Sequence, residues 1–293
     1  MPKDLIPAVD AERVVIRSDG RDLSYYVAGD GDPVLLIHSI NAAASVYEVK
    51  PVFDALATRY RVFAPDLPGF GFSDRSDRDY TIDVYTTAVR DMLQVIGQGP
   101  GVHVLGLSLS SEFVARQANR TPDAFRSLAL VTPTGFDRGS DSLRATEGAT
   151  RENAIAAGLA GIPGFRAGLF KLLVRPGTVR FFLKRTFGSD NVDESLARYC
   201  TLTASQPGAL YAPLAFLSGR LFARDIRQVY ESLLMPVWLA HGTRGDFRDF
   251  SETGWTQQRS NWTVTSFDTG AIPYFEQHER FMNAYVEFLD GVD

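Results

Sequence analysis

The chain has 293 residues, of which 45% are hydrophobic and 22% charged, a composition typical of a globular protein. Its net charge of −5 argues against nucleic acid as the main partner. No apolar run is long enough for a membrane-spanning helix, the N-terminus lacks the apolar core of a secretory signal, and the single cysteine, Cys200, excludes an internal disulfide. These features predict a soluble cytoplasmic protein.

Short β-rich runs alternate with helical patterns, which predicts an α/β fold with a mostly parallel sheet and crossover helices. The first two strands are expected to form a hairpin that turns at Asp19 and Gly20. The eight predicted strands are 13–16, 23–27, 34–37, 60–64, 102–105, 125–131, 237–240 and 262–267. Helical spacing of apolar residues predicts helices at 47–58, 81–96, 112–119 and 275–289.

The alternation stops after the sixth strand, where mainly helical segments with Gly/Pro breaks follow. We therefore expect a core formed by residues 1–135 and 229–293 and interrupted by a helical cap, 136–228. Within it, residues 140–225 hold 11 Lys/Arg and 7 Asp/Glu, a net +4, so the remainder carries −9. Solvated helix faces explain such an asymmetry, and an anionic ligand or membrane surface is the alternative.

The pentapeptide 106–110, Gly-Leu-Ser-Leu-Ser, joins a predicted strand to a predicted helix and nearly matches the G-x-S-x-G nucleophile elbow. So tight a turn needs small residues on both sides of the serine, and its strained backbone exposes the Oγ of Ser108. The start of the helix also directs backbone N–H groups at the site, which favours developing negative charge.

Three further segments extend the pattern. Residues 66–73 match a D-x-P-G-x-G-x-S loop, residues 38–40 stand where an H-G-x loop is expected, and residues 270–277 are similar to the segment that opens a last helix. Together with the elbow they resemble the α/β-hydrolase superfamily over the whole predicted core. The resemblance implies a mostly parallel eight-stranded sheet with a cap inserted after strand six. It also implies that Ser108 is the nucleophile and that the backbone N–H groups of Ile40 and Leu109 form the oxyanion hole.

The base and the acid depart from this family pattern. The catalytic histidine should follow the glycine that Gly270 matches, but the chain has Ala271, which cannot accept a proton. In the acid loop, Gly245 stands where aspartate is expected, which leaves Asp246, one place later, as the preferred acid.

Other residues could replace the missing group. His241 ends a strand near the site, His278 lies seven residues beyond Ala271, and Asp137 follows the sixth strand, so each is an alternative base or acid. His38 is expected to brace the oxyanion loop. No metal-ligand spacing, phosphate loop or dinucleotide fingerprint is present, so no metal or cofactor is expected.

Two functions remain open from the sequence. The first is hydrolysis of a small hydrophobic ester, thioester or related carbonyl compound through Ser108. The alternative is a small-ligand binding protein, or a lyase or isomerase, that uses the same pocket. Gibberellin receptors resemble this case, since they keep the fold and the serine without the histidine. The apolar and basic stretch 165–185 predicts a helix pair that roofs the pocket, with membrane contact as its alternative.

Overall fold

A computed structural model describes residues 4–97, 99, 101–138, 149–153, 158 and 163–292. Parts of the predicted insertion, residues 139–148, 154–157 and 159–162, lie outside the described residues. No helix in the described part is both long and apolar enough to cross a lipid bilayer.

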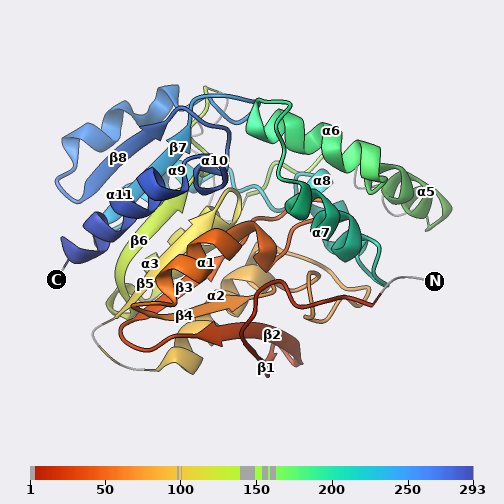
Figure 1. Cartoon of the computed structure of the whole chain (residues 1–293), viewed down its shortest axis with the longest axis horizontal. Helices are drawn as coiled ribbons and strands as arrows, with labels where there is room; N and C mark the ends of the chain where they lie inside the picture. The colour runs from red at the N-terminus through yellow and green to blue at the C-terminus, as the bar shows by residue number, and fades with distance from the viewer. Residues whose placement is uncertain are drawn as a thin grey trace.

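Eight strands form one sheet in the order β1-β2-β4-β3-β5-β6-β7-β8 (Figure 1). The pairs β1–β2 and β2–β4 are antiparallel, and every other pair is parallel, which confirms the predicted sheet. The first hairpin turns at Asp19 and Gly20, as predicted. The strands are β1 (Glu12–Ser18), β2 (Arg21–Ala28), β3 (Pro33–Ile37), β4 (Arg61–Pro65), β5 (Val102–Leu107), β6 (Phe125–Val131), β7 (Val237–Gly242) and β8 (Trp262–Phe267).

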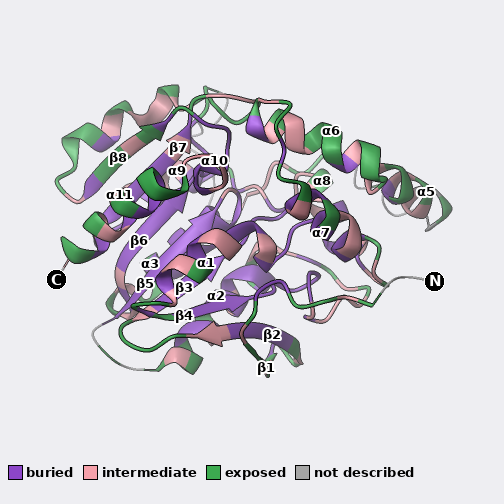
Figure 2. Ribbon diagram, in the orientation of Figure 1, coloured by how far each residue is buried: buried purple, intermediate pink, exposed green. Residues whose placement is uncertain are grey.

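Helices cover both faces of this sheet. Alternate strand residues such as Leu105 and Ala240 pack with α1 (Lys50–Leu56) and α11 (His278–Asp290). Their neighbours along the strands, such as Val104 and Leu239, pack on the other face with α2 (Ile82–Ile96), α3 (Ser110–Arg120) and α9 (Ile226–Glu231). Both faces are therefore buried, as Figure 2 shows, and this explains why the central strands are continuous apolar runs.

The remaining helices are given in chain order. They are η1 (Val46–Val49), η2 (Pro122–Ala124), α5 (Pro163–Leu173), α6 (Pro176–Phe187), α7 (Glu194–Ala204), α8 (Tyr211–Leu217), η3 (Ser251–Gln258) and α10 (Pro273–Glu276). Helices α5 to α9 lie between β6 and β7, and we call them the inserted helices.

Two predicted helices differ from the observed ones. The segment predicted at 47–58 is the short η1 followed by α1, which ends at Leu56. The predicted closing helix is divided into α10 and α11 at Gln277, whose φ of −126° and ψ of 58° are not helical. His278 consequently starts α11 instead of lying inside a continuous helix.

Candidate functional site

Strand β5 turns into α3 at Ser108, and this turn has the geometry of a nucleophile elbow. Ser108 has φ of 55°, in the left-handed region that costs an ordinary residue about 1–2 kcal/mol. Two backbone bonds hold it there, from Ser108 N to Val131 O (2.8 Å) and from Ser111 N to Ser108 O (3.0 Å). A Cβ on Gly106 would lie 3.1 Å from the Cα of Ser111, so the crossing of strand and helix favours glycine there.

The last elbow residue, Ser110, joins the elbow to the loop after β3. Its hydroxyl donates to the carbonyl oxygen of His38 at 2.6 Å. The His38 ring is fully buried, with Nδ1 2.7 Å from Ser39 O and Nε2 accepting from Leu67 N at 3.0 Å. Burial lowers the pKa of His38 to about 4, so the ring is neutral at pH 7. Because both ring nitrogens are bonded, His38 braces the loop.

The sequence reasoning missed Glu48, a buried carboxylate that organises this loop. It accepts the backbone N–H and the hydroxyl of Ser39 at 3.0 and 2.7 Å, and the side-chain amide of Asn41 at 2.7 Å. Burial raises the pKa of Glu48, and the hydrogen bonds from Ser39 and Asn41 oppose that shift. The signal in the sequence was Ser39 itself, because a hydroxyl in place of the family's glycine needs a buried partner.

Two backbone amides beside Ser108 are available for a ligand. Ile40 and Leu109 are each 1% exposed, and neither backbone N–H has an acceptor among the described residues. The pairing of Ile37 with Gly106 brings the ends of β3 and β5 together, so both amides follow adjacent strand ends. Buried backbone N–H groups nearly always donate a hydrogen bond. Two such groups without an acceptor, both next to a nucleophile elbow, are suited to bind an oxyanion. The Ser108 hydroxyl also has no hydrogen-bond partner within the described residues.

The C-terminal end of α6 contacts the loops that follow β7 and β8. Asp246 N donates to Arg185 O at 3.0 Å, and Ala271 N donates to Thr186 O at 2.9 Å. The carbonyl oxygen of Ala271 accepts from the hydroxyl of Thr132 at 2.7 Å. Both the N–H group and the carbonyl group of Ala271 are therefore hydrogen-bonded, and its side chain is a buried methyl group.

Close contacts between backbones explain why glycines stand in these loops. Gly245 has φ of 78°, and a Cβ there would lie 2.4 Å from Arg185 O. A Cβ on Gly188 would lie 2.3 Å from Gly245 N, and one on Gly270 would lie 2.3 Å from Phe187 Cα. We call residues 185–188, 242–246 and 269–271 the backbone junction. An aspartate at 245 therefore does not fit this junction without displacing the backbone of α6.

The four residues predicted as the acid or as an alternative base lie away from Ser108. Asp246 is exposed and forms an ion pair with Arg185. The half-buried ring of His241 stacks on Phe250, with centroids 4.1 Å apart, and its Nδ1 is 2.9 Å from Gly242 O. Burial lowers the pKa of His241. Because β6 separates β7 from β5, the strands of His241 and Ser108 are about 10 Å apart.

Asp137 and His278 are both exposed. Within the described residues, none of Asp246, His241, His278 and Asp137 forms a hydrogen bond with Ser108. The structure thus brings Ser108, Ile40 and Leu109 together and leaves the four predicted acid or base candidates apart from them.

A second buried carboxylate, Glu112 on α3, contacts the inserted helices. It accepts from the hydroxyl of Thr134 at 2.5 Å and from Ala223 N at 2.9 Å, and burial raises its pKa to about 7. Nearby, Arg116 pairs with Asp225 at 2.7 Å, also buried. These contacts connect α3 to the chain between α8 and α9.

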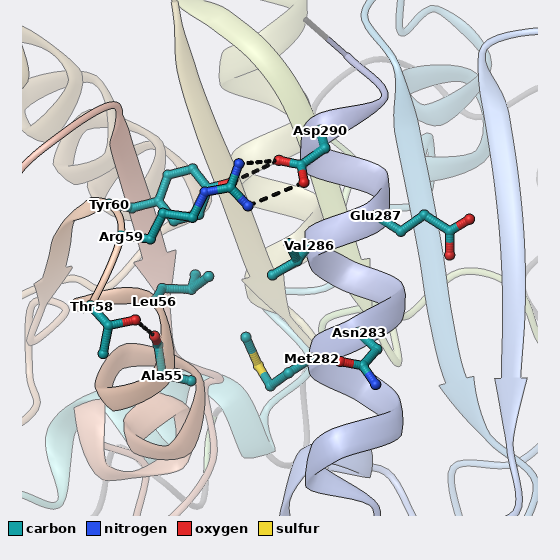
Figure 3. A pocket seen from close by; sticks show the side chains of 10 residues that line it. All are labelled: Ala55, Leu56, Thr58, Arg59, Tyr60, Met282, Asn283, Val286, Glu287 and Asp290. Atoms are coloured by element: carbon teal, nitrogen blue, oxygen red, sulfur yellow. Dashed lines mark hydrogen bonds and ion pairs between the residues drawn. The ribbon is translucent and has the colours of Figure 1, made fainter.

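A surface groove of about 560 Å³ lies between α1 and α11 (Figure 3). The side chains of Leu56, Met282 and Val286 point into it, and Arg59 pairs with Asp290 at its rim. Arg59 comes just before β4, so this groove is at the amino edge of the sheet, whereas Ser108 is at the carboxyl edge.

Among the described residues, no group of three His, Cys, Asp or Glu side chains could hold a metal ion.

Comparisons with known proteins agree with this geometry. A family model described as alpha/beta hydrolase fold matches residues 32–173. An uncharacterized protein of Mycobacterium tuberculosis is 34% identical over 115 residues, which are 39% of this chain and 33% of that protein. The chain thus matches about a third of the length of such curated relatives.

A longer match is to a pimeloyl-[acyl-carrier protein] methyl ester esterase of Aeromonas hydrophila, 26% identical over 72% of this chain and 76% of the esterase. A solved structure, the meta-cleavage product hydrolase of Pseudomonas fluorescens IP01, superimposes with a TM-score of 0.72 at 21% identity, over 96% of this chain and 98% of that one. The chain therefore has the α/β-hydrolase fold.

Proposed function

We propose that the protein is a hydrolase that cleaves a small hydrophobic ester, thioester or related carbonyl compound through Ser108. One observation carries this proposal. Ser108 is held in a strained conformation with an unbonded hydroxyl, next to the two unpaired buried amides of Ile40 and Leu109. Strained residues persist where their surroundings hold them, and they cluster at active sites.

The proposed reaction follows from these groups. The carbonyl oxygen of the substrate accepts hydrogen bonds from the N–H groups of Ile40 and Leu109. The Oγ of Ser108 attacks the carbonyl carbon, and the two amides stabilise the oxyanion that forms. The alkoxide or thiolate that leaves takes a proton from water, which regenerates hydroxide, and the acyl group remains on Ser108 until a second water releases it as an acid. One such amide donor is typically worth about 10²–10³ in kcat.

The proton of Ser108 has no histidine to receive it, because no hydrogen bond joins a histidine to this serine within the described residues. We propose that hydroxide from solvent takes the proton. Loss of a triad member reduces the rate by about 10⁴–10⁶, so turnover should be slow and should rise with pH. Asp246, His241, His278 and Asp137 remain predictions for an acid or base, and alanine substitution of each tests them.

The proposed substrate is hydrophobic because the surroundings of the elbow are apolar. Ile40, Leu109, Ala271 and Phe187 are all buried, and Phe187 belongs to the inserted helices. We propose that these helices act as the cap of the pocket. The similarity to a methyl ester esterase supports an ester as the first substrate class to assay.

A non-hydrolytic binding protein is the second candidate, and the backbone junction favours it. Ala271 and Gly245 stand where the family's base and acid are expected; a side chain at 245 would meet the backbone of α6, and the backbone N–H of Ala271 is bonded to Thr186 O. The amides of Ile40 and Leu109 would then bind the carbonyl group of a ligand without cleaving it.

A fluorophosphonate probe distinguishes the two candidates. Labelling of the native protein at Ser108, absent from Ser108→Ala, is the result expected for the hydrolase. Failure to label Ser108 at any pH between about 6 and 10 would reject it.

Ala271→His provides a second measurement, with Ala271→Gln as a control of similar size that cannot act as a base. Circular dichroism shows whether each variant folds. Esterase activity in the native protein, increased in Ala271→His, supports the hydrolase. Activity that appears in Ala271→His alone supports the binding protein.

A further inference from the structure

Helices α5 and α6 expose apolar side chains that the proposed reaction does not use. Leu172 on α5 is 50% exposed, and Phe181 and Phe182 on α6 are 52% and 48% exposed. Figure 2 shows both helices largely exposed, in contrast to the buried sheet. Ten large apolar side chains are exposed in the described residues, and three of them lie on these two helices. Exposed apolar side chains gathered on neighbouring helices can form an interaction surface.

On α6, Phe181 lies opposite the buried Val179, and Phe182 lies on the flank between the two. Val179 is buried, and Phe181, two residues later, lies about 200° away around the helix. Lys184 and Arg185, three and four residues after Phe181, share its face. The guanidinium of Arg185 lies 5.6 Å from the centroid of the Phe181 ring.

Helix α5 repeats this arrangement. Phe170 is buried, and the exposed Leu172, two residues later, lies about 200° away around the helix. Each helix therefore presents an exposed apolar side chain on the side away from a buried one.

The charge of the two helices is entirely positive. Residues 163–187 contain six Lys/Arg and no Asp or Glu. Lys171 and Arg175 have no ion-pair partner among the described residues. The other four pair with acids outside the two helices: Arg166 with Asp77, Arg180 with Glu194, Lys184 with Asp190 and Arg185 with Asp246. Exposed pairs of this kind are weak, so these cations can exchange partners.

We propose that the outward face of α5 and α6 docks on an anionic lipid surface. Leu172, Phe181 and Phe182 enter the boundary between headgroups and acyl chains, and the surrounding Lys and Arg contact anionic headgroups. Lipid is favoured over a protein partner because residues 163–187 carry six cations and no acid of their own, and Lys171 and Arg175 have no ion-pair partner among the described residues. Docking does not depend on hydrolysis. It would place the lipid next to the backbone junction, which the end of α6 enters.

Vesicle flotation with the full chain tests this docking. We expect binding to vesicles of phosphatidylcholine with phosphatidylglycerol, little binding to phosphatidylcholine alone, and loss of binding as salt screens the charges. The double variant Lys171→Gln/Arg175→Gln should bind about 30-fold more weakly, since each cation near the surface contributes roughly fivefold. Phe181→Gln/Phe182→Gln should also bind at least about tenfold more weakly.

Matched controls lie on other surfaces. Leu234 is 78% exposed and the side chain of Arg120 is 50% exposed, so Leu234→Gln and Arg120→Gln should bind like the native protein. Equal binding to neutral and anionic vesicles, no binding at all, or equal weakening in the controls would overturn the proposal. A different result would also overturn it: the native protein self-associates, the Phe181→Gln/Phe182→Gln variant does not, and neither binds vesicles. The face would then be an interface between copies of the chain.

Discussion

The backbone junction makes Gly245→Ala a sharp test of why residue 245 is glycine. Gly245 has φ of 78°, and placing an L-residue there costs about 1–2 kcal/mol. The added methyl group would lie 2.4 Å from Arg185 O and 3.0 Å from Gly188 N, both backbone atoms. Relieving such an overlap typically costs another 1–3 kcal/mol or so. We therefore expect the free energy of unfolding to fall by about 2–5 kcal/mol, and the Tm by about 5–15 °C.

Gly20→Ala is the matched control for this prediction. Gly20 has a similar φ of 71°, but a Cβ there would meet no heavy atom within 4 Å. The free energy of unfolding of Gly20→Ala should fall only by the cost of the left-handed backbone conformation, about 1–2 kcal/mol. Equilibrium unfolding in urea, followed by circular dichroism, measures both variants. Equal losses at the two positions would show that residue 245 has room for a side chain, and the explanation for its glycine would fail.

Three further predictions concern the buried polar groups. Glu112 has a folded pKa of about 7 against 4.5 unfolded, so its protonated form should favour folding by about 3 kcal/mol below pH 4.5, a gain lost as pH rises to 7. Glu112→Gln should flatten this part of the stability–pH curve in urea titrations. Ser110→Ala removes the 2.6 Å bond to His38 O and should lower the rate of Ser108 labelling about tenfold. Glu48→Ala should lower that rate more than Glu48→Gln, which retains an acceptor; equal rates would exclude a positioning role.

The strands could be predicted because their burial leaves a strong pattern. Strands covered on both faces must be apolar at nearly every position, as in Val34 to Ile37, and all eight predicted strands are present. The break at Gln277 was missed because the apolar spacing of α11 continues into α10, and only the backbone angles show the division.

At the site, the elbow could be predicted and the junction could not. Gly106 and Ser110 are small because of contacts within one short turn, so the local sequence records them. Gly188 and Gly245 are 57 positions apart in the chain, and their contact depends on where α6 ends above the sheet. The partnership of Glu48 with Ser39 likewise requires the fold of the loop after β3.

The pH dependence of Ser108 labelling by a fluorophosphonate tests most directly whether this serine reacts without a histidine base. If hydroxide takes the proton, the logarithm of the labelling rate should rise linearly with pH, about tenfold per unit, between pH 6 and 9. A rate that levels off above an inflection near pH 7 would reveal a titrating imidazole beside Ser108 and would contradict the account.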